Sequence, residues 1–216
     1  MNRIVDLSHP LDASCISIYP GDPDFKCFPC CLIDRDGYSV HSIAMGSHTG
    51  THIDAPAHFV ADGKTVDGIA LASLTGPALV IDLVHKGERE PITWVDLVAH
   101  SEQMKPGVIL LLRTDWSRYW ATPKYFNHPY LTRDAAKEIV KRGVTVLGVD
   151  TLSPDETGGT LGDFGVHEEF LGAGNVIAEN LTNLELVGTG FMVCFAPLNL
   201  KGSDGAPVRA FAFPMS

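Results

Sequence analysis

The segment of residues 46–58 constrains this chain more than any other, because it places three histidines and one aspartate within eleven consecutive positions. Side chains alternate between the two faces of a strand, so an extended backbone directs His48, His52 and Asp54 to the same side. A helix would also bring the two histidines together, but the glycines, β-branched residues and Pro56 of this segment disfavour one. We therefore predict an extended segment that ends at Pro56.

The chemistry of these side chains favours a bound divalent metal ion. Zinc and similar borderline ions accept neutral imidazoles and carboxylates, and a catalytic site leaves one coordination position to water. His48, His52 and Asp54 fit that pattern. His58 follows a proline at which we expect the chain to turn, so we predict that it moves protons beside the metal and is not a ligand. The alternative is a set of histidines bonded to backbone carbonyls, but burying several unpaired imidazoles together would be costly.

The composition predicts one domain over residues 1–216, with a small molecule or another protein as its partner. A chain of 216 residues with 45% hydrophobic content can bury a substantial core. The net charge of −10 disfavours binding to nucleic acid or to anionic lipid, which attract basic surfaces. No apolar run approaches the roughly 20 residues that a membrane-spanning helix needs, and the N-terminus lacks an apolar signal core. We expect a soluble, cytoplasmic protein.

The cysteines are expected to be reduced thiols. Their number, five, is odd, and the chain carries no secretory signal. Cys27 and Cys30 have the spacing of a redox motif, but the residues that follow indicate a strand and not the helix that activates such a thiol.

The hydrophobic pattern predicts a mixed α/β fold. Two strands, over residues 26–33 and 38–45, are joined by a short turn and lead into the histidine segment. Strands and helices then alternate, with Thr93 and Thr132 as predicted N-caps. Further strands are expected at residues 78–84, 108–112, 144–150, 191–196 and 208–213, and a glycine-rich loop at 158–162. Trp116, Tyr119 and Trp120 are predicted to belong to the core, with a pocket wall as the alternative.

The run from His48 to His58 resembles the HxGTHxDxPxH signature of the metal-dependent cyclase family, which includes bacterial kynurenine formamidases and isatin hydrolases. It matches that signature at every fixed position. The resemblance also covers residues 19–22, 113–116, 148–150 and 167–184. It implies a swivelling β/β/α fold, usually found as a homodimer.

The resemblance implies a second group of metal ligands far along the chain. Glu179 lies in a predicted apolar strand, where a carboxylate is costly to bury unless a cation compensates it. His167 lies at the start of a predicted short helix, a position that would by itself suggest an exposed histidine. By resemblance, these two residues and Asp54 hold a second divalent ion, and Asp54 and Glu179 bridge the pair. Zinc is the first choice for both ions, and manganese is the alternative.

The resemblance implies hydrolysis of an amide bond by a metal-activated water, with His58 passing the proton to the leaving nitrogen. The first candidate is the arylformamidase reaction, from N-formylkynurenine to kynurenine and formate. Formamidases of the family usually carry tryptophan where this chain has Tyr19, which is therefore expected to line the substrate pocket. One alternative is an isatin-hydrolase-like enzyme that opens a cyclic amide or lactone. Another is a non-catalytic protein that binds a metal or a metabolite.

Overall fold

The computed structural model describes residues 4–158 and 163–215. Most of the glycine-rich loop predicted at residues 158–162 therefore lies outside the described residues.

The main strands of the structure lie close to the predicted positions. They are β1 (Val5–Asp6), β2 (Lys26–Cys31), β3 (Val40–Ala44), β4 (His52–Asp54), β5 (Thr75–Asp82), β6 (Pro91–Ile92), β7 (Ile109–Arg113), β8 (Tyr130–Leu131), β9 (Val146–Val149), β10 (Val176–Glu179), β11 (Phe191–Pro197) and β12 (Gly205–Pro214). The α-helices are α1 (Ile33–Asp36), α2 (Trp94–Leu97), α3 (Arg133–Lys141) and α4 (Gly165–Gly172).

Eight of the described strands form one mixed sheet in the order β1-β12-β11-β5-β7-β9-β10-β4. Strands β5, β7, β9 and β10 are parallel, whereas β4, β11 and β12 pair antiparallel with their neighbours. Strand β4 also pairs with β12, so the sheet closes on itself into a barrel. The prediction of a mixed α/β fold is confirmed.

The parallel strands β7, β9 and β10 are buried on both faces, and their sequences explain why. Strand β7 reads Ile-Leu-Leu-Leu-Arg, and its first four residues are fully buried. One set of strand side chains faces the barrel interior, where Leu111 and Phe195 pack. The other set, including Leu110 and Ile177, packs against α3 and α4 on the outside of the barrel. A continuous apolar strand is the pattern expected for a parallel sheet covered on both sides.

Two helix starts carry the predicted caps. The Thr132 hydroxyl accepts the Ala135 N–H at the start of α3. Thr93 and Asp96 form a reciprocal capping box at α2. Such caps satisfy backbone N–H groups that have no partner within the helix.

One prediction about the histidine segment is wrong in detail. The strand covers only His52–Asp54, and His48 lies in the turn before it. Gly50 has a φ of 68°, a left-handed conformation that interrupts an extended backbone. After the strand, Pro56 opens a single 3₁₀ turn that ends at His58, as expected for a chain that turns at this proline.

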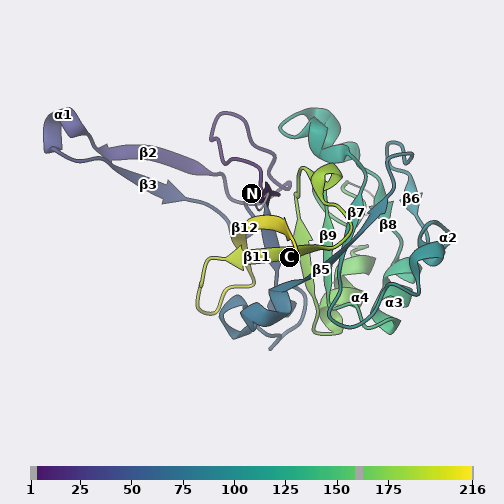
Figure 1. The fold of residues 1–216 in the computed structure, drawn as a ribbon. Coiled ribbons are helices and arrows are strands. Elements are labelled where there is room, and N and C mark those ends of the chain that lie inside the picture. Colours follow the sequence, from purple (N-terminus) through teal and green to yellow (C-terminus); the bar gives the residue numbers. More distant parts are fainter. Residues whose placement is uncertain (1–3, 159–162, 216) are drawn as a thin grey trace.

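Strands β2 and β3 form a separate hairpin that projects from the body of the molecule, with α1 at its tip (Figure 1). Cys27 and Cys30 lie on β2, and both thiols are free and exposed. Among the described residues, no helix has the length and apolar character that a bilayer span requires.

Candidate metal centre

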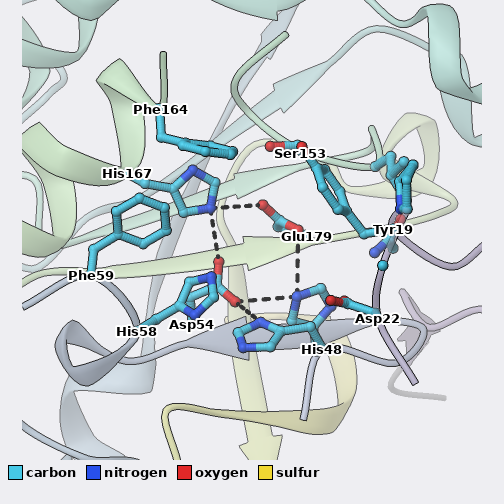
Figure 2. Close-up of a pocket in the computed structure, with 15 residues that line it drawn as sticks. Tyr19, Asp22, His48, Asp54, His58, Phe59, Ser153, Phe164, His167 and Glu179 are labelled. Carbon is cyan, nitrogen blue, oxygen red and sulfur yellow. Dashed lines mark hydrogen bonds and ion pairs between the residues drawn. The ribbon is translucent and has the colours of Figure 1, made fainter. Parts of the chain in front are cut away.

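The register between β4 and β10 builds the base of the site. His52 and Asp54 lie two residues apart on β4, so their side chains share one face of the strand. Glu179 is the direct partner of His52 across the antiparallel pair, and it therefore faces the same side. Helix α4 adds His167 above this pair, so residues more than a hundred positions apart meet at one place (Figure 2).

Two imidazoles and two carboxylates alternate in a buried ring of four side chains. Asp54 Oδ1 lies 3.2 Å from His52 Nε2, and Asp54 Oδ2 lies 3.5 Å from His167 Nε2. Glu179 repeats the arrangement, with Oε2 at 3.4 Å from His52 Nε2 and Oε1 at 3.4 Å from His167 Nε2. Each carboxylate thus stands between the same two histidines. That placement suits a carboxylate that bridges two cations.

His48 and His58 complete the site from more open positions. Gly50 turns the chain so that His48 Nδ1 lies 2.6 Å from Asp54 Oδ1. The ring of His58 stacks at a tilt on that of His48, with their centroids 4.0 Å apart. The structure therefore brings together all five predicted ligands and the predicted proton-transfer residue.

Unsatisfied polar atoms test whether these residues fit a metal. Within the described part of the chain, His52 Nε2, Asp54 Oδ2 and Glu179 Oε1 are buried and have no hydrogen-bond partner. A buried polar atom without a partner costs free energy, and such atoms normally find one. Here the unsatisfied atoms converge, and they are of the types that zinc and manganese accept. The donor set fits a metal ion.

The directions of the pKa shifts indicate that negative charge predominates among these side chains. Burial raises the pKa of Glu179, and the neighbouring charge of Asp54 raises it further. Burial lowers the pKa values of His52 and His167, but the carboxylates around them outweigh this effect and raise both. Packed carboxylates stabilise any cation placed between them. A bound divalent ion would compensate the carboxylate charges, and the histidines would not need to be protonated.

Hydrogen bonds to residues outside this group hold the rings of the candidate ligands in orientation. The Asp155 carboxylate accepts from His167 Nδ1 at 2.6 Å and also from the backbone N–H groups of Val166 and His167 at the start of α4. This leaves His167 Nε2 facing Asp54 and Glu179. Hydrogen bonds of this kind fix the tautomer of a metal-binding histidine.

A second outer network orients His52. His52 Nδ1 donates to the Gly50 carbonyl at 2.8 Å, and the same carbonyl accepts from the Asn180 side-chain amide at 3.0 Å. The Tyr125 hydroxyl donates to the other end of that amide at 3.0 Å. Asn180 directly follows β10, so it ties the Glu179 strand to the turn that carries His48.

The site opens into a cavity of about 350 Å³ with aromatic walls. Figure 2 shows Phe59 and Phe164 beside His167, and Tyr19 on the opposite side near Asp22. Burial, then the nearby Glu179 carboxylate, raises the pKa of Tyr19, so its hydroxyl keeps its proton. Tyr19 lines the cavity, as the sequence predicts. An aromatic slot beside a polar centre suits a small aromatic substrate.

A second group of aromatic side chains lies behind the cavity wall, where it packs against Tyr19 and Leu152. Trp116 and Tyr125 are buried in a satellite core, with Tyr119 and Trp120 packed against them. Since Trp116, Tyr119 and Trp120 are absent from the residues that line the cavity, they form core and not a pocket wall.

Comparison with known proteins identifies the family. The sequence model of a family described as "Putative cyclase" matches residues 5–156, which is most of the chain. The chain belongs to this cyclase family. The kynurenine formamidase of Bacillus cytotoxicus is 32% identical, over 98% of this chain and 97% of that protein. The kynurenine formamidase of Geobacillus thermodenitrificans is 33% identical, over 97% of each. The resemblance read from residues 48–58 is confirmed.

Solved structures of related proteins share the fold. Isatin hydrolase A from Ralstonia solanacearum superposes with a TM-score of 0.89 at 28% identity, covering 99% of this chain and 92% of that one. A protein described as a "potential metal-dependent hydrolase with cyclase activity" gives a TM-score of 0.82 at 28% identity, covering all of both chains.

Three site residues were missed by sequence reasoning. Asp155 bonds the His167 ring, Asn180 bonds the Gly50 carbonyl that also accepts from His52, and Asp204 contacts both His48 and His58. Asn180 directly follows the predicted ligand Glu179, and a polar side chain at the end of a buried strand was a signal that could have found it. Asp155 and Asp204 lie in loops, where an aspartate is common and carries no such signal.

Proposed function

We propose that this protein is an arylformamidase-like hydrolase that cleaves the amide C–N bond of a small aromatic substrate, with N-formylkynurenine as the first candidate. The observation that carries the proposal is the cavity itself, in which unsatisfied imidazole and carboxylate atoms lie beneath walls of Tyr19, Phe59 and Phe164. The similarity to kynurenine formamidases over nearly the full chain supports the choice of an acyclic aromatic amide.

The residues divide into ligands and a proton-transfer group. His48, His52 and Asp54 would hold one divalent ion, and Asp54, His167 and Glu179 a second, with zinc as the first choice and manganese as the alternative. When bound, such ions acidify a water molecule and stabilise negative charge on a carbonyl oxygen.

His58 supplies the proton transfer in this proposal. Burial lowers the pKa of His58, so the ring is neutral near pH 7 and can accept a proton from the attacking water. It then returns that proton to the leaving nitrogen. Phe59 and Phe164 hold the aromatic part of the substrate and exclude water from that side of the cavity.

The alternative within the same chemistry is an isatin-hydrolase-like enzyme that opens a cyclic amide or a lactone. The structural likeness to isatin hydrolase A favours this candidate, and it requires the same ligands. Turnover of N-formylkynurenine and isatin should therefore be measured side by side, with zinc-loaded, manganese-loaded and chelator-treated protein. We expect faster turnover of N-formylkynurenine, abolished by the chelator. Faster turnover of isatin would select the alternative, whereas binding of both compounds without turnover would indicate a non-catalytic binding protein.

We also propose that the protein forms a homodimer through the β2–β3 hairpin. The hairpin exposes 53% of Phe28, 69% of Ile33 and 60% of Ile43, and a two-stranded hairpin alone is only marginally stable in water. A second copy would bury these side chains. Light scattering should give twice the chain mass for the wild type and a lower mass for the double variant Ile33→Asp/Ile43→Asp. A monomeric wild type would refute the proposal.

The thiols support a cytoplasmic location. Cys15, Cys27 and Cys30 are free and exposed, and such thiols persist in a reducing compartment. Cell fractionation that follows the enzyme activity would test this placement.

A further inference from the structure

Asp204 lies beside the site, outside the residues that match the family's sequence model. It directly precedes β12, the strand that closes the barrel against β4. Its backbone carbonyl accepts the Ala55 N–H at 2.8 Å, which fixes this residue next to the end of β4. Its carboxylate is therefore held over the two histidines that flank the cavity.

One oxygen of this carboxylate contacts both rings. Asp204 Oδ2 lies 2.9 Å from His48 Nε2 and 3.2 Å from His58 Nδ1. A carboxylate oxygen only accepts hydrogen bonds when ionised, so both of these ring nitrogens must carry the proton. His58 Nε2 is left as the basic nitrogen of its ring. His48 Nδ1 faces a second carboxylate, Asp54 Oδ1, at 2.6 Å, and would be free of its proton only with a cation bound there.

That assignment matches what each ring has to do. His48 Nδ1 is the nitrogen that faces Asp54, at 2.6 Å, on the side where a metal ion would be held. His58 lines the cavity, so a basic Nε2 is available to a proton from that side. If Asp204 were absent, the His58 ring could adopt the other tautomer, and His48 would lose one of its two carboxylate partners.

The next residue, Gly205, lies too close to His48 and Ile53 to carry a side chain. A Cβ atom at Gly205 would lie 2.7 Å from His48 Cε1 and 3.0 Å from the Ile53 carbonyl oxygen. Glycine at this position therefore lets the His48 ring lie against the start of β12. The Asp204-Gly205 pair thus supplies both the acceptor and the space that the ring needs.

We propose that Asp204 is a positioning residue that fixes the tautomer of His58 and bonds His48 through the same carboxylate oxygen, and so couples the proton-transfer group to a proposed metal ligand. This inference rests on the proposed function, because it assumes that His58 moves the proton. The removal of outer partners of this kind typically costs about 10- to 100-fold in activity or metal affinity.

The first test follows the ring nitrogens and needs no activity. The zinc-loaded protein, labelled with ¹⁵N-histidine, should show His58 protonated at Nδ1 in the wild type, with His58→Ala used to assign its signals. In Asp204→Ala we expect a mixture of tautomers for His58. An unchanged His58 tautomer in that variant would overturn the proposal.

The second test is kinetic and uses a matched control. With saturating metal, Asp204→Ala should lower kcat by about 10- to 100-fold, with KM changed less than about twofold. Asp204→Glu should restore part of the loss. The control is Asp67→Asn, since Asp67 accepts the Gly202 N–H of the same loop at 2.9 Å and is absent from the cavity lining. We expect this variant to stay within about twofold of wild type. Equal losses in Asp204→Ala and Asp67→Asn would show that Asp204 only supports the loop.

A double variant tests whether Asp204 affects kcat through His58. In a His58→Ala background, Asp204→Ala should lower the remaining kcat by less than about twofold, since its effect passes through the missing ring. If the loss of kcat in the double variant equals the product of the losses in the two single variants, the proposal is overturned. If the wild type hydrolyses neither N-formylkynurenine nor isatin, the proposed function fails, and the nitrogen signals still decide the role of Asp204.

Discussion

The two halves of the site are built in different ways. The buried half consists of His52, Asp54, His167 and Glu179, whose side chains are between 1% and 7% exposed. The open half consists of His48, His58 and Asp204, which are between 14% and 41% exposed. The buried half is positioned by the register of β4 and β10 and by helix α4, whereas the open half depends on a turn, a 3₁₀ turn and the loop before β12.

This difference suggests a division of labour. Two strands and a helix hold four of the five groups that would bind metal, since such groups must be held within about 0.5 Å of the productive geometry. A 3₁₀ turn holds His58, the proposed proton-transfer group, at the cavity wall. Substitutions in the buried half, and of the proposed ligand His48, should therefore remove metal, whereas those of His58 and Asp204 should slow turnover while metal remains.

The largest effect is expected from Glu179→Gln. This change removes a buried carboxylate that stands between His52 and His167, so metal affinity should fall by more than about 100-fold and activity with it. Metal content after dialysis, measured by mass spectrometry, checks the prediction. The exposed Glu185→Gln is the matched control and should bind metal normally. Full metal content in Glu179→Gln would mean that the buried half is not the binding site.

The second effect belongs to the open half. His58→Ala should lower kcat by about 10²- to 10⁴-fold, the usual contribution of a general acid–base group, while metal content stays close to that of the wild type. The exposed His85→Ala serves as the control for loss of a histidine. Because His48, Asp54 and His58 also lie close enough to share an ion, loss of metal in His58→Ala would show that His58 is a ligand.

Asp155→Asn should give an intermediate effect. The asparagine can still bond to His167, but it lacks the charge and can present the wrong group to the ring, so metal affinity should fall by about 10- to 100-fold. The free energy of unfolding should also fall by about 1 kcal/mol, because Asp155 accepts two backbone N–H groups at the start of α4. Metal titration and thermal unfolding measure the two parts. Wild-type metal affinity in this variant would remove Asp155 from the site.

The smallest effect concerns a histidine outside both halves. His128 is buried, but Nδ1 bonds the Pro129 carbonyl and Nε2 bonds the Thr157 hydroxyl, so both nitrogens are satisfied without a metal. Burial lowers the pKa of His128 to about 4, below the value of about 6.5 in an unfolded chain. The folded state thus resists protonation, and its stability should fall as the pH falls from 6.5 towards 4.

This dependence can be measured by denaturant unfolding of the metal-free protein at pH 7 and pH 5. The wild type should lose about 2 kcal/mol more between these values than His128→Gln does. Parallel losses in the two proteins would show that folding does not lower the pKa of His128. The comparison would also show how an ordinary buried histidine differs from His52, whose Nε2 is unsatisfied.

Much of the buried half could be predicted from sequence, for physical reasons. His52 and Asp54 share a strand face by alternation alone, and Glu179 stands out as a carboxylate in an apolar strand. The pairing of Glu179 with His52 depends on a register that no local pattern reports. The resemblance to a known family was needed to join His167 to them.

The open half was less accessible. His48 reaches the site through a glycine in a left-handed conformation, and not by strand alternation as predicted. Asp204 follows His48 by 156 positions and lies in a loop, so its contact with the ring appears only once the barrel has closed. Contacts of this separation depend on the whole topology, which periodicity and capping signals do not specify.

The closure of the barrel by β12 also has a consequence for how the enzyme is made. Strand β12 comes off the ribosome after every other strand described here, yet it must pair with β4 to seal the sheet and bring Asp204 to the histidines. A chain still under synthesis can build most of its core, but it has an open seam beside its metal-binding groups. Hydrolytic activity should therefore emerge only after translation has passed the last strand, which would keep half-made chains from acting on substrate.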